Sequence, residues 1–192
     1  MRAPLPTLPR IRTPRLILRL AEIEDVQQIL RFMQENREFL ARWEPRRTEA
    51  YYSEDYWRRQ VPQNISDFHG DRSLRLFLFA SEDDKRIIGN LSFNNIVRGA
   101  AQFCHCGYAL AEAEQGKGLM SEALKAAMDF VFKHLGMHRV MANYIPHNVR
   151  SGAVLKRLGF VIEGTAKDYL LIDGKWEDHV LTSLVNTDWR AE

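Results

Sequence analysis

The sequence is short of cysteine, because only Cys104 and Cys106 occur among its 192 residues. On a strand, residues two apart share a face, and joining them by a disulfide would distort the backbone. No apolar run approaches the ~20 residues of a membrane span. The first six residues also lack the apolar core of a secretory signal. These absences exclude a disulfide scaffold, and we expect a cytoplasmic protein with no membrane partner.

An excess of charge of one sign is also lacking. Lys and Arg together number 27 and Asp and Glu 25, which gives a formal net charge of +2. This balance argues against broad nucleic-acid binding. The amino-terminal segment is a local exception, since it carries five arginines and no acidic residue: Arg2, Arg10, Arg12, Arg15 and Arg19. We expect residues 1–14 to form an extended basic arm, which is either a solvated tail or a contact for ribosomal RNA phosphates.

Two common phosphate-binding motifs are absent, namely the Walker loop and the three-glycine Rossmann loop. Instead, the run Gln115-Gly116-Lys117-Gly118 leads directly into an amphipathic helix that begins with Leu119 and Met120. Glycine lets the backbone approach an anion, and the N–H groups and dipole at a helix start attract negative charge. Lys117 adds a full positive charge. The run predicts a pyrophosphate site, although Gly-Lys-Gly before a helix also occurs in ordinary turns.

Hydrophobic periodicity predicts one domain over residues 15–189, with no linker or repeat. Antiparallel strands, then a strand–helix–strand crossover, then a terminal hairpin indicate an α/β fold with a mixed, mostly antiparallel sheet flanked by helices. Pro62 is expected to break or kink the third helix, and Asp173-Gly174 predicts a type I′ turn. The expected strands are 16–20, 74–80, 86–93, 104–110, 138–143, 161–172 and 176–185, and the expected helices are 24–35, 37–42, 53 onward, 118–135 and 149–158.

Two short motifs carry a resemblance to a known family. Gln115-x-x-Gly118 is similar to the acetyl-coenzyme A loop of the GCN5-related N-acetyltransferases (GNATs), and Asn148-x-x-Ser151 with Gly159-Phe160 resembles their second motif. The stretches 93–99, 141–148 and 167–174 closely resemble the RimJ-type ribosomal-protein-alanine N-acetyltransferases. The resemblance extends from about residue 15 to residue 189. Met120 departs from the general family pattern, which usually has glycine or alanine at that position.

The resemblance implies a GNAT fold in which two central strands splay apart and the pantetheine arm of acetyl-coenzyme A lies in the gap. It implies acetyl-coenzyme A as cosubstrate, no metal, and direct attack on the thioester by the N-terminal alanine amine of a small-subunit ribosomal protein. Two alternatives stay open: acetylation of a small-molecule amine such as a polyamine or an antibiotic, or a ribosome-associated assembly factor that binds acetyl-coenzyme A. The cofactor-binding residues it implies are Tyr108, Ala109, Leu110, Gln115, Gly116, Lys117, Gly118, Leu119, Met120, Asn143, Asn148 and Ser151.

His105 is the candidate general base of such a reaction. Imidazole titrates near neutrality, and an α-amino group with a pKa of about 7.7 to 8.0 needs only a modest base. A packed strand histidine is the alternative interpretation. The neighbouring Cys104 and Cys106 do not predict a zinc site, because adjacent strand residues alternate faces and no second cysteine pair exists to complete four ligands.

Ser151 and Tyr169 are the candidate general acids for the departing thiolate. The hydroxyl of Ser151 could equally cap a helix, and a tyrosine on an apolar strand is often a core residue. By resemblance, Asn36, Trp43 and Glu44 shape the acceptor side, although Trp43 could instead pack the helices together.

Overall fold

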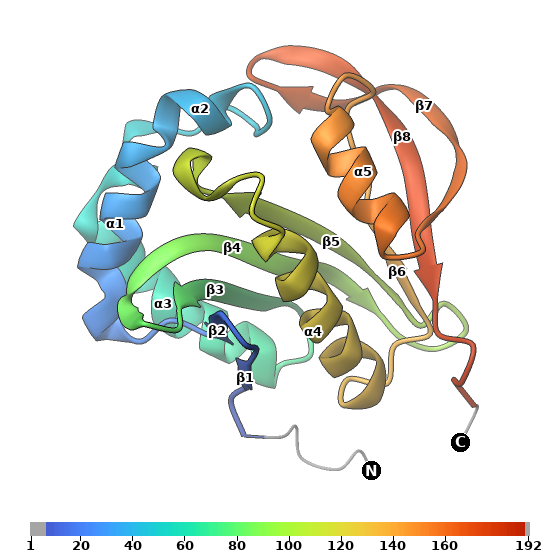
Figure 1. The fold of residues 1–192 in the computed structure, drawn as a ribbon, viewed down its shortest axis with the longest axis horizontal. Helices are drawn as coiled ribbons and strands as arrows, with labels where there is room; N and C mark the ends of the chain where they lie inside the picture. The colour runs from blue at the N-terminus through green and yellow to red at the C-terminus, as the bar shows by residue number, and fades with distance from the viewer. Residues whose placement is uncertain (1–6, 191–192) are drawn as a thin grey trace.

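Eight strands form one mixed sheet within residues 7–190, the part of the chain that the computed structural model describes (Figure 1). The strands follow the spatial order β1-β2-β3-β4-β5-β6-β8-β7. β5 and β6 pair in parallel, and the other neighbours pair antiparallel. The predicted α/β domain with a mostly antiparallel sheet is therefore confirmed. The strands are β1 Arg10–Arg12, β2 Leu16–Arg19, β3 Leu74–Ala80, β4 Asp83–Val97, β5 Phe103–Leu110, β6 Arg139–Met141, β7 Val161–Ile172 and β8 Lys175–Val185.

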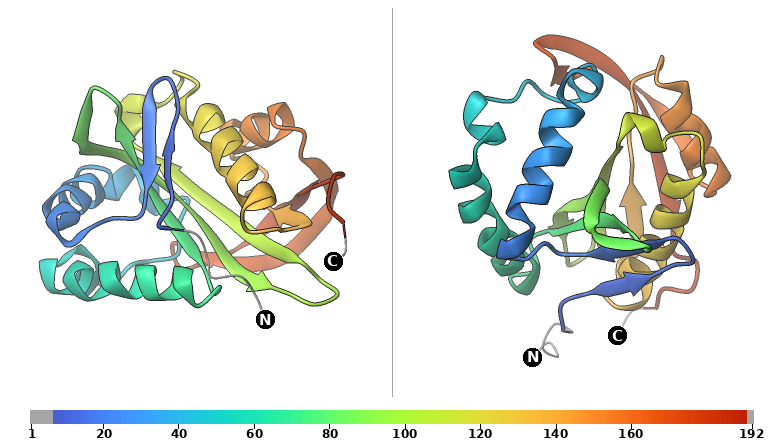
Figure 2. Two further views of the ribbon diagram at one scale, coloured as in Figure 1. Left: turned by 90° about the horizontal axis from the view of Figure 1, so that it is seen from below. Right: turned by 60° about the vertical axis from the view of Figure 1, so that its left-hand side comes forward.

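Helices cover both faces of the sheet (Figure 2). One face carries α1 (Val26–Glu35), α2 (Arg37–Ala41) and α3 (Glu54–His69), and the other carries α4 (Leu119–Lys133) and α5 (Val149–Arg157). Strand β3 shows why two cores result. Its residues 74, 76 and 78 pack in the α4 core, whereas residues 77 and 79 pack in the α1 core. A strand buried on both faces reads as a continuous apolar run, as this one does.

Helix α3 contradicts the predicted break at Pro62, and a kink there stays a prediction. The helix runs without a break through this proline to His69. Pro62 is exposed, so the carbonyl that loses its hydrogen-bond donor lies on the solvent side, where water can replace the bond. The opposite side of the helix packs through Trp57 and Phe68, which are fully buried, and this packing outweighs the lost bond. The predicted start is correct, because the Ser53 hydroxyl accepts a hydrogen bond from the first turn.

The sheet opens between β5 and β6. Three residue pairs join these strands, and the last is His105 with Met141. Beyond it, β5 continues along β4 as far as Leu110. The chain after β6 follows β8 instead, because Ala142 N donates to Thr182 O at 3.0 Å and the backbone of residue 144 pairs with that of residue 180. The two central strands therefore diverge, as the resemblance implied.

The two ends of the chain show how the expected arm and hairpin are built. Arg10–Arg12 of the expected basic arm form β1, the edge strand paired with β2, and Arg10 lies 3.7 Å from Asp84. Arg2 lies outside the described residues, and contact of the arm with RNA stays a prediction. At the other end, Asp173 and Gly174 have φ values of +42° and +82°, as a type I′ turn requires.

No helix within residues 7–190 has the length and apolar content needed to cross a bilayer.

Candidate active site

The glycine loop after β5 presents free backbone donors at the start of α4. Gly116 and Gly118 both have φ of +76°, a conformation that other residues adopt only with strain. A Cβ at Gly116 would meet nothing within 4 Å, so the backbone and not the available space requires glycine there. Residues 7–190 supply no acceptor for the N–H groups of residues 116–118. These donors lie at the positive end of a 15-residue helix, which is a suitable place for an anion.

The charge of Lys117 is already balanced. Its Nζ lies 2.9 Å from Glu114 Oε2, and the same carboxylate accepts a bond from Arg86 Nη1 at 2.7 Å. Both cations lower the pKa of Glu114, with Arg86 contributing most. Binding of a phosphate by Lys117 stays a prediction, and it would require the lysine to leave this ion pair.

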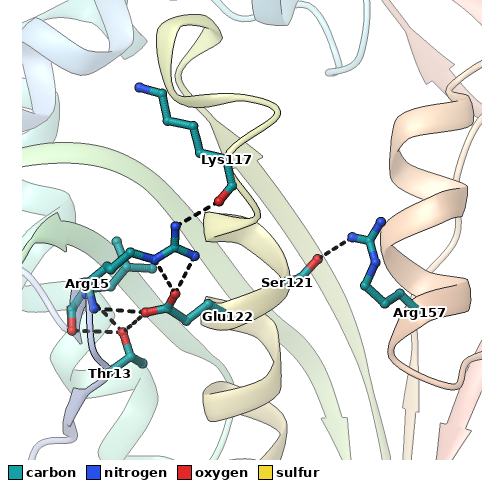
Figure 3. Close-up of polar contacts among 7 residues, drawn as sticks. Thr13, Arg15, Lys117, Ser121, Glu122 and Arg157 are labelled. Atoms are coloured by element: carbon teal, nitrogen blue, oxygen red, sulfur yellow. Dashed lines mark hydrogen bonds and ion pairs between the residues drawn. The ribbon is translucent and has the colours of Figure 1, made fainter.

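Two arginines on α5 border the same loop without an acidic partner in the described chain. Arg150 Nη1 donates to Gln115 Oε1 at 2.7 Å. Arg157 Nη1 donates to Ser121 Oγ at 2.9 Å, as Figure 3 shows. Both partners are neutral, so the two positive charges remain available to an anion. Sequence reasoning missed these arginines. Their seven-residue spacing, which places both on one face of a helix following the loop, was the available signal.

Tyr108 and Ser151 meet beside the gap. The Tyr108 hydroxyl lies 2.8 Å from Ser151 Oγ, and Asn148 Oδ1 accepts the N–H of Ser151 at 3.2 Å. Asn148 therefore caps α5, and the Ser151 hydroxyl faces Tyr108 instead of capping the helix. Burial raises the pKa of Tyr108, against a smaller lowering by Ser151, so the phenol stays protonated at neutral pH. Contact of any of the three with coenzyme A stays a prediction.

His105 lies at the apex of the gap, in the last residue pair that joins β5 to β6. The side chain is half-buried, and its Nδ1 is buried without a hydrogen-bond partner from residues 7–190. Burial lowers the pKa of His105 below its ordinary value. Cys104 and Cys106 belong to the α4 core on the opposite face, where burial raises the pKa of Cys104 to about 12. The orphaned ring nitrogen fits a role toward a ligand, and that role stays a prediction.

Tyr169 projects from a bulge in β7. The register with β8 shifts between Ala166 and Leu170, and Asp168 has φ of +46°. Tyr169 is 37% exposed, so it is not a core residue, and its hydroxyl accepts a bond from Asn143 Nδ2 at 3.4 Å. Asn143 lies just beyond β6 at the gap. The structure thus brings the candidate acid together with a candidate pantetheine ligand.

The predicted acceptor residues have different surroundings. Asn36 is buried and bonded at both ends, because Nδ2 donates to Phe32 O at 2.9 Å and Oδ1 accepts Glu112 N at 3.0 Å. It therefore ties the α1–α2 junction to the segment after β5. Trp43 is half-buried, and its ring lies 5.5 Å from that of His147 on the β6–α5 loop. That contact joins the α2 side to the cofactor side.

Glu44 borders a cavity of about 310 Å³ between α1, α2, the following segment and the tip of the β7–β8 hairpin. The main chain closes one side, where Asp173 N donates to Glu44 O at 3.1 Å. The Glu44 carboxylate lies 3.3 Å from Arg47 Nη2. The cavity is lined by Met33, Arg37, Leu40, Ala41, Glu44, Pro45, Arg46, Arg47, Glu49, Tyr51, Tyr52 and Asp173.

The remaining cofactor candidates take part mainly in the core. Leu110, Leu119 and Met120 are 8%, 7% and 7% exposed and join the α4 core. Ala109 packs against the α1 core. Their backbone groups could still reach a coenzyme, but their side chains are largely occupied by packing. The bulk of Met120, the departure from the family pattern, is accommodated by this core.

Comparison with known proteins gives the family. A family model described as an acetyltransferase (GNAT) domain matches residues 15–161. The chain belongs to this family. It is 47% identical over 180 residues to a [ribosomal protein uS5]-alanine N-acetyltransferase of Escherichia coli, covering 94% of this chain and 92% of the relative. This chain is thus a GNAT acetyltransferase.

Solved structures of relatives share the fold over nearly the whole chain. The ribosomal-protein-S5-alanine acetyltransferase of Vibrio fischeri has a TM-score of 0.90 and 37% identity, covering 95% of this chain and 99% of that one. Mycobacterium smegmatis RimJ, in complex with a CoA-disulfide, has a TM-score of 0.83 and 28% identity, with coverages of 93% and 86%. The expected relationship to RimJ-type enzymes is confirmed.

Proposed function

We propose that this GNAT transfers acetyl from acetyl-coenzyme A to the N-terminal alanine amine of a ribosomal protein. The observation that carries the proposal is the open gap between β5 and β6 with the glycine loop at its mouth. The E. coli relative named for alanine acetylation aligns over 94% of this chain, which supports the acceptor.

The coenzyme would lie along the gap. Its pyrophosphate would accept bonds from the free N–H groups of residues 116–118, and Arg150 and Arg157 would supply positive charge. The pantetheine arm carries amide groups, which can bond to the backbone groups of residues 106–110 and of Asn143 that face the gap, whereas Ala142 and Tyr144 bond to β8. The M. smegmatis relative, whose structure contains a CoA-disulfide, supports a coenzyme site in this fold.

The acetyl transfer would proceed by direct attack. The neutral amine nitrogen bonds to the thioester carbon, the oxyanion collapses, and the carbon–sulfur bond breaks. His105 takes the proton that the amine nitrogen loses and passes it to solvent, and the coenzyme thiolate is protonated from solvent after it leaves. Either hydroxyl of the Tyr108–Ser151 pair can be the donor of their hydrogen bond. In the proposed step Tyr108 donates, which leaves the Ser151 hydrogen free to point at the departing sulfur and stabilise its charge. Tyr169 remains the second candidate for this position.

The residues after the acceptor alanine would occupy the cavity beside Glu44. Its arginines are matched by carboxylates, in the pairs Arg37 with Glu49, Arg46 with Asp173, and Arg47 with Glu44. The lining therefore offers paired charges instead of a single sign. The acidic turn at residues 82–84 does not line this cavity, because Asp84 borders a different one together with Arg19 and Lys85.

The test uses the purified protein, labelled acetyl-coenzyme A and two peptides. One peptide begins with a free alanine, and the other has the same sequence with a blocked amino end and an internal lysine. We expect label on the alanine amine alone, located by mass spectrometry. Label on the lysine, or on neither peptide, would contradict the proposed acceptor, and turnover of a free polyamine would then indicate the small-molecule alternative.

A further inference from the structure

Arg15 joins the amino-terminal segment to the first turn of α4. Its Nε lies 2.7 Å from Glu122 Oε2 and its Nη2 lies 2.6 Å from the same oxygen. The other carboxylate oxygen of Glu122 accepts Thr13 Oγ1 at 2.6 Å and the Arg15 N–H at 3.0 Å (Figure 3). Burial raises the pKa of Glu122, but the bonds from Thr13 and Arg15 more than offset this and hold it below its ordinary value. The guanidinium is thereby fixed in position.

The remaining arm of the guanidinium reaches the phosphate loop. Arg15 Nη1 donates to the carbonyl oxygen of Lys117 at 2.9 Å (Figure 3). A trans peptide group is planar, and its C=O and N–H point in opposite directions. Because the Lys117 carbonyl points at Arg15, the N–H of Gly118 points away from Arg15. Arg15 therefore sets the direction of one of the donors proposed for the pyrophosphate.

Glycines make this control necessary. Gly118 has no Cβ and can adopt either sign of φ at little cost, so the peptide between Lys117 and Gly118 can rotate more easily than an ordinary one. Rotation by half a turn would direct the carbonyl oxygen at the phosphate, which is repulsive, and would withdraw the N–H. A bond that holds the carbonyl on the other side favours the binding orientation before the coenzyme arrives.

We propose that Arg15 is a positioning residue for coenzyme binding, which holds the Lys117–Gly118 peptide with its N–H directed at the pyrophosphate. The inference rests on the proposed function, in which this loop binds the pyrophosphate. Arg15 is not itself the phosphate ligand, because Glu122 cancels its charge and its Nε, Nη1 and Nη2 are all engaged. It acts through the loop backbone.

The test compares Arg15→Met and Arg15→Lys with the matched control Arg59→Met, an exposed arginine on α3. Each variant is assayed with acetyl-coenzyme A and with S-acetylpantetheine, which lacks the pyrophosphate. We expect Arg15→Met to raise KM for acetyl-coenzyme A about tenfold, near the lower end of the cost of a hydrogen bond to a charged group. KM for acetylpantetheine and kcat should stay as in the control. Arg15→Lys, which keeps one of the bonds, should have a KM for acetyl-coenzyme A between those of Arg15→Met and the control.

Glu122→Gln separates positioning from direct phosphate binding. If Arg15 were a phosphate ligand, removing the carboxylate charge would free the guanidinium and tighten coenzyme binding. If Arg15 positions the peptide, the loosened anchor should weaken binding, by about threefold for a partly retained network. Tighter binding in Glu122→Gln, or an equal rise in KM for both acetyl donors in Arg15→Met, would overturn the inference.

Gly118→Val separates a missing positioning role of Arg15 from a missing pyrophosphate site at the loop. A variant that blocks the loop itself, such as Gly118→Val, should raise KM for acetyl-coenzyme A whether or not Arg15 matters. If Gly118→Val acts and Arg15→Met does not, the positioning role is wrong and the pyrophosphate site stands. If neither acts, the pyrophosphate is bound elsewhere.

Discussion

Replacing Gly118 by alanine gives a sharp test of the phosphate loop. At φ of +76°, an alanine costs about 1–2 kcal/mol more than glycine. The added Cβ would meet only Arg15 Nη2, at an ordinary contact of 3.7 Å, so the cost is backbone strain and not a clash. The loop can respond to this strain in two ways. If the loop keeps its conformation, the whole protein loses the energy as stability, and if the loop relaxes, the coenzyme must restore the conformation when it binds.

The two responses predict different changes in Tm and in KM for acetyl-coenzyme A. A fully retained loop would lower Tm by roughly 2–8 °C, at about 2–4 °C per kcal/mol for a domain of this size. A fully relaxed loop would raise KM for acetyl-coenzyme A by roughly 5- to 30-fold, since 1.4 kcal/mol corresponds to a factor of ten. We expect thermal melts to show a lower Tm and steady-state kinetics a higher KM, each change smaller than its limiting value. Unchanged Tm together with unchanged KM would refute the reasoning.

Gly136→Ala is the matched control. Gly136 has φ of +62° in the turn after α4, and a Cβ there would meet nothing within 4 Å. The same strain applies, but away from the glycine loop. We expect a comparable fall in Tm with no change in KM. A rise in KM in this variant would mean that strain anywhere on the scaffold disturbs coenzyme binding, and the Gly118 result would then lose its meaning.

Four further predictions concern the gap and its supports. Ser151→Ala should lower kcat at least about tenfold with little change in KM, because its hydroxyl is assigned to the leaving sulfur. Tyr108→Phe should lower kcat by a smaller factor. A rise in KM as large as the fall in kcat would contradict this assignment. Asn148→Ala should destabilise the protein by about 1 kcal/mol through loss of the α5 cap, seen as a lower denaturation midpoint. The acid limb of kcat should have its midpoint below pH 6.5, because burial lowers the pKa of His105 and the neutral base persists to lower pH; a limb unchanged in His105→Ala would remove the residue from this role. Glu122, whose pKa is held below its ordinary value of 4.5, contributes stability that is complete above about pH 4.5 and is lost as pH falls through the lowered pKa, so Glu122→Gln should flatten the dependence of Tm on pH in this range.

The local elements could be predicted from the sequence because their signals are local. Alternation and helical spacing placed the strands and helices, and the Asp173-Gly174 turn followed from two residues that tolerate positive φ. Pro62 does not end α3, because tertiary packing on the other side of the helix outweighs a local preference. The gap between β5 and β6 could be expected only from the family resemblance, since periodicity does not report which strands pair.

The electrostatics of the candidate site could not be predicted in this way. Lys117 lies in the phosphate loop, but its charge is balanced by Glu114, and only the folded turn brings Arg86 to the same carboxylate. The bond from Arg15 to the loop carbonyl spans 102 residues of sequence, and no local pattern marks it. Charges act over distances in space, so their pairing depends on the completed fold.

The three residue pairs between β5 and β6 make the sheet mechanically uneven. On one side lie β1 to β5 with α1 and α2, and on the other lie β6, β8 and β7 with α5. Near the coenzyme loop, three side-chain bonds also join the two halves, those of Gln115 with Arg150, Ser121 with Arg157 and Tyr108 with Ser151. A molecule bound along the gap would contact both halves of the sheet and restrain their motion relative to each other. Binding should therefore slow the hydrogen exchange of backbone amides throughout β6 and β8, including amides that do not contact the bound molecule.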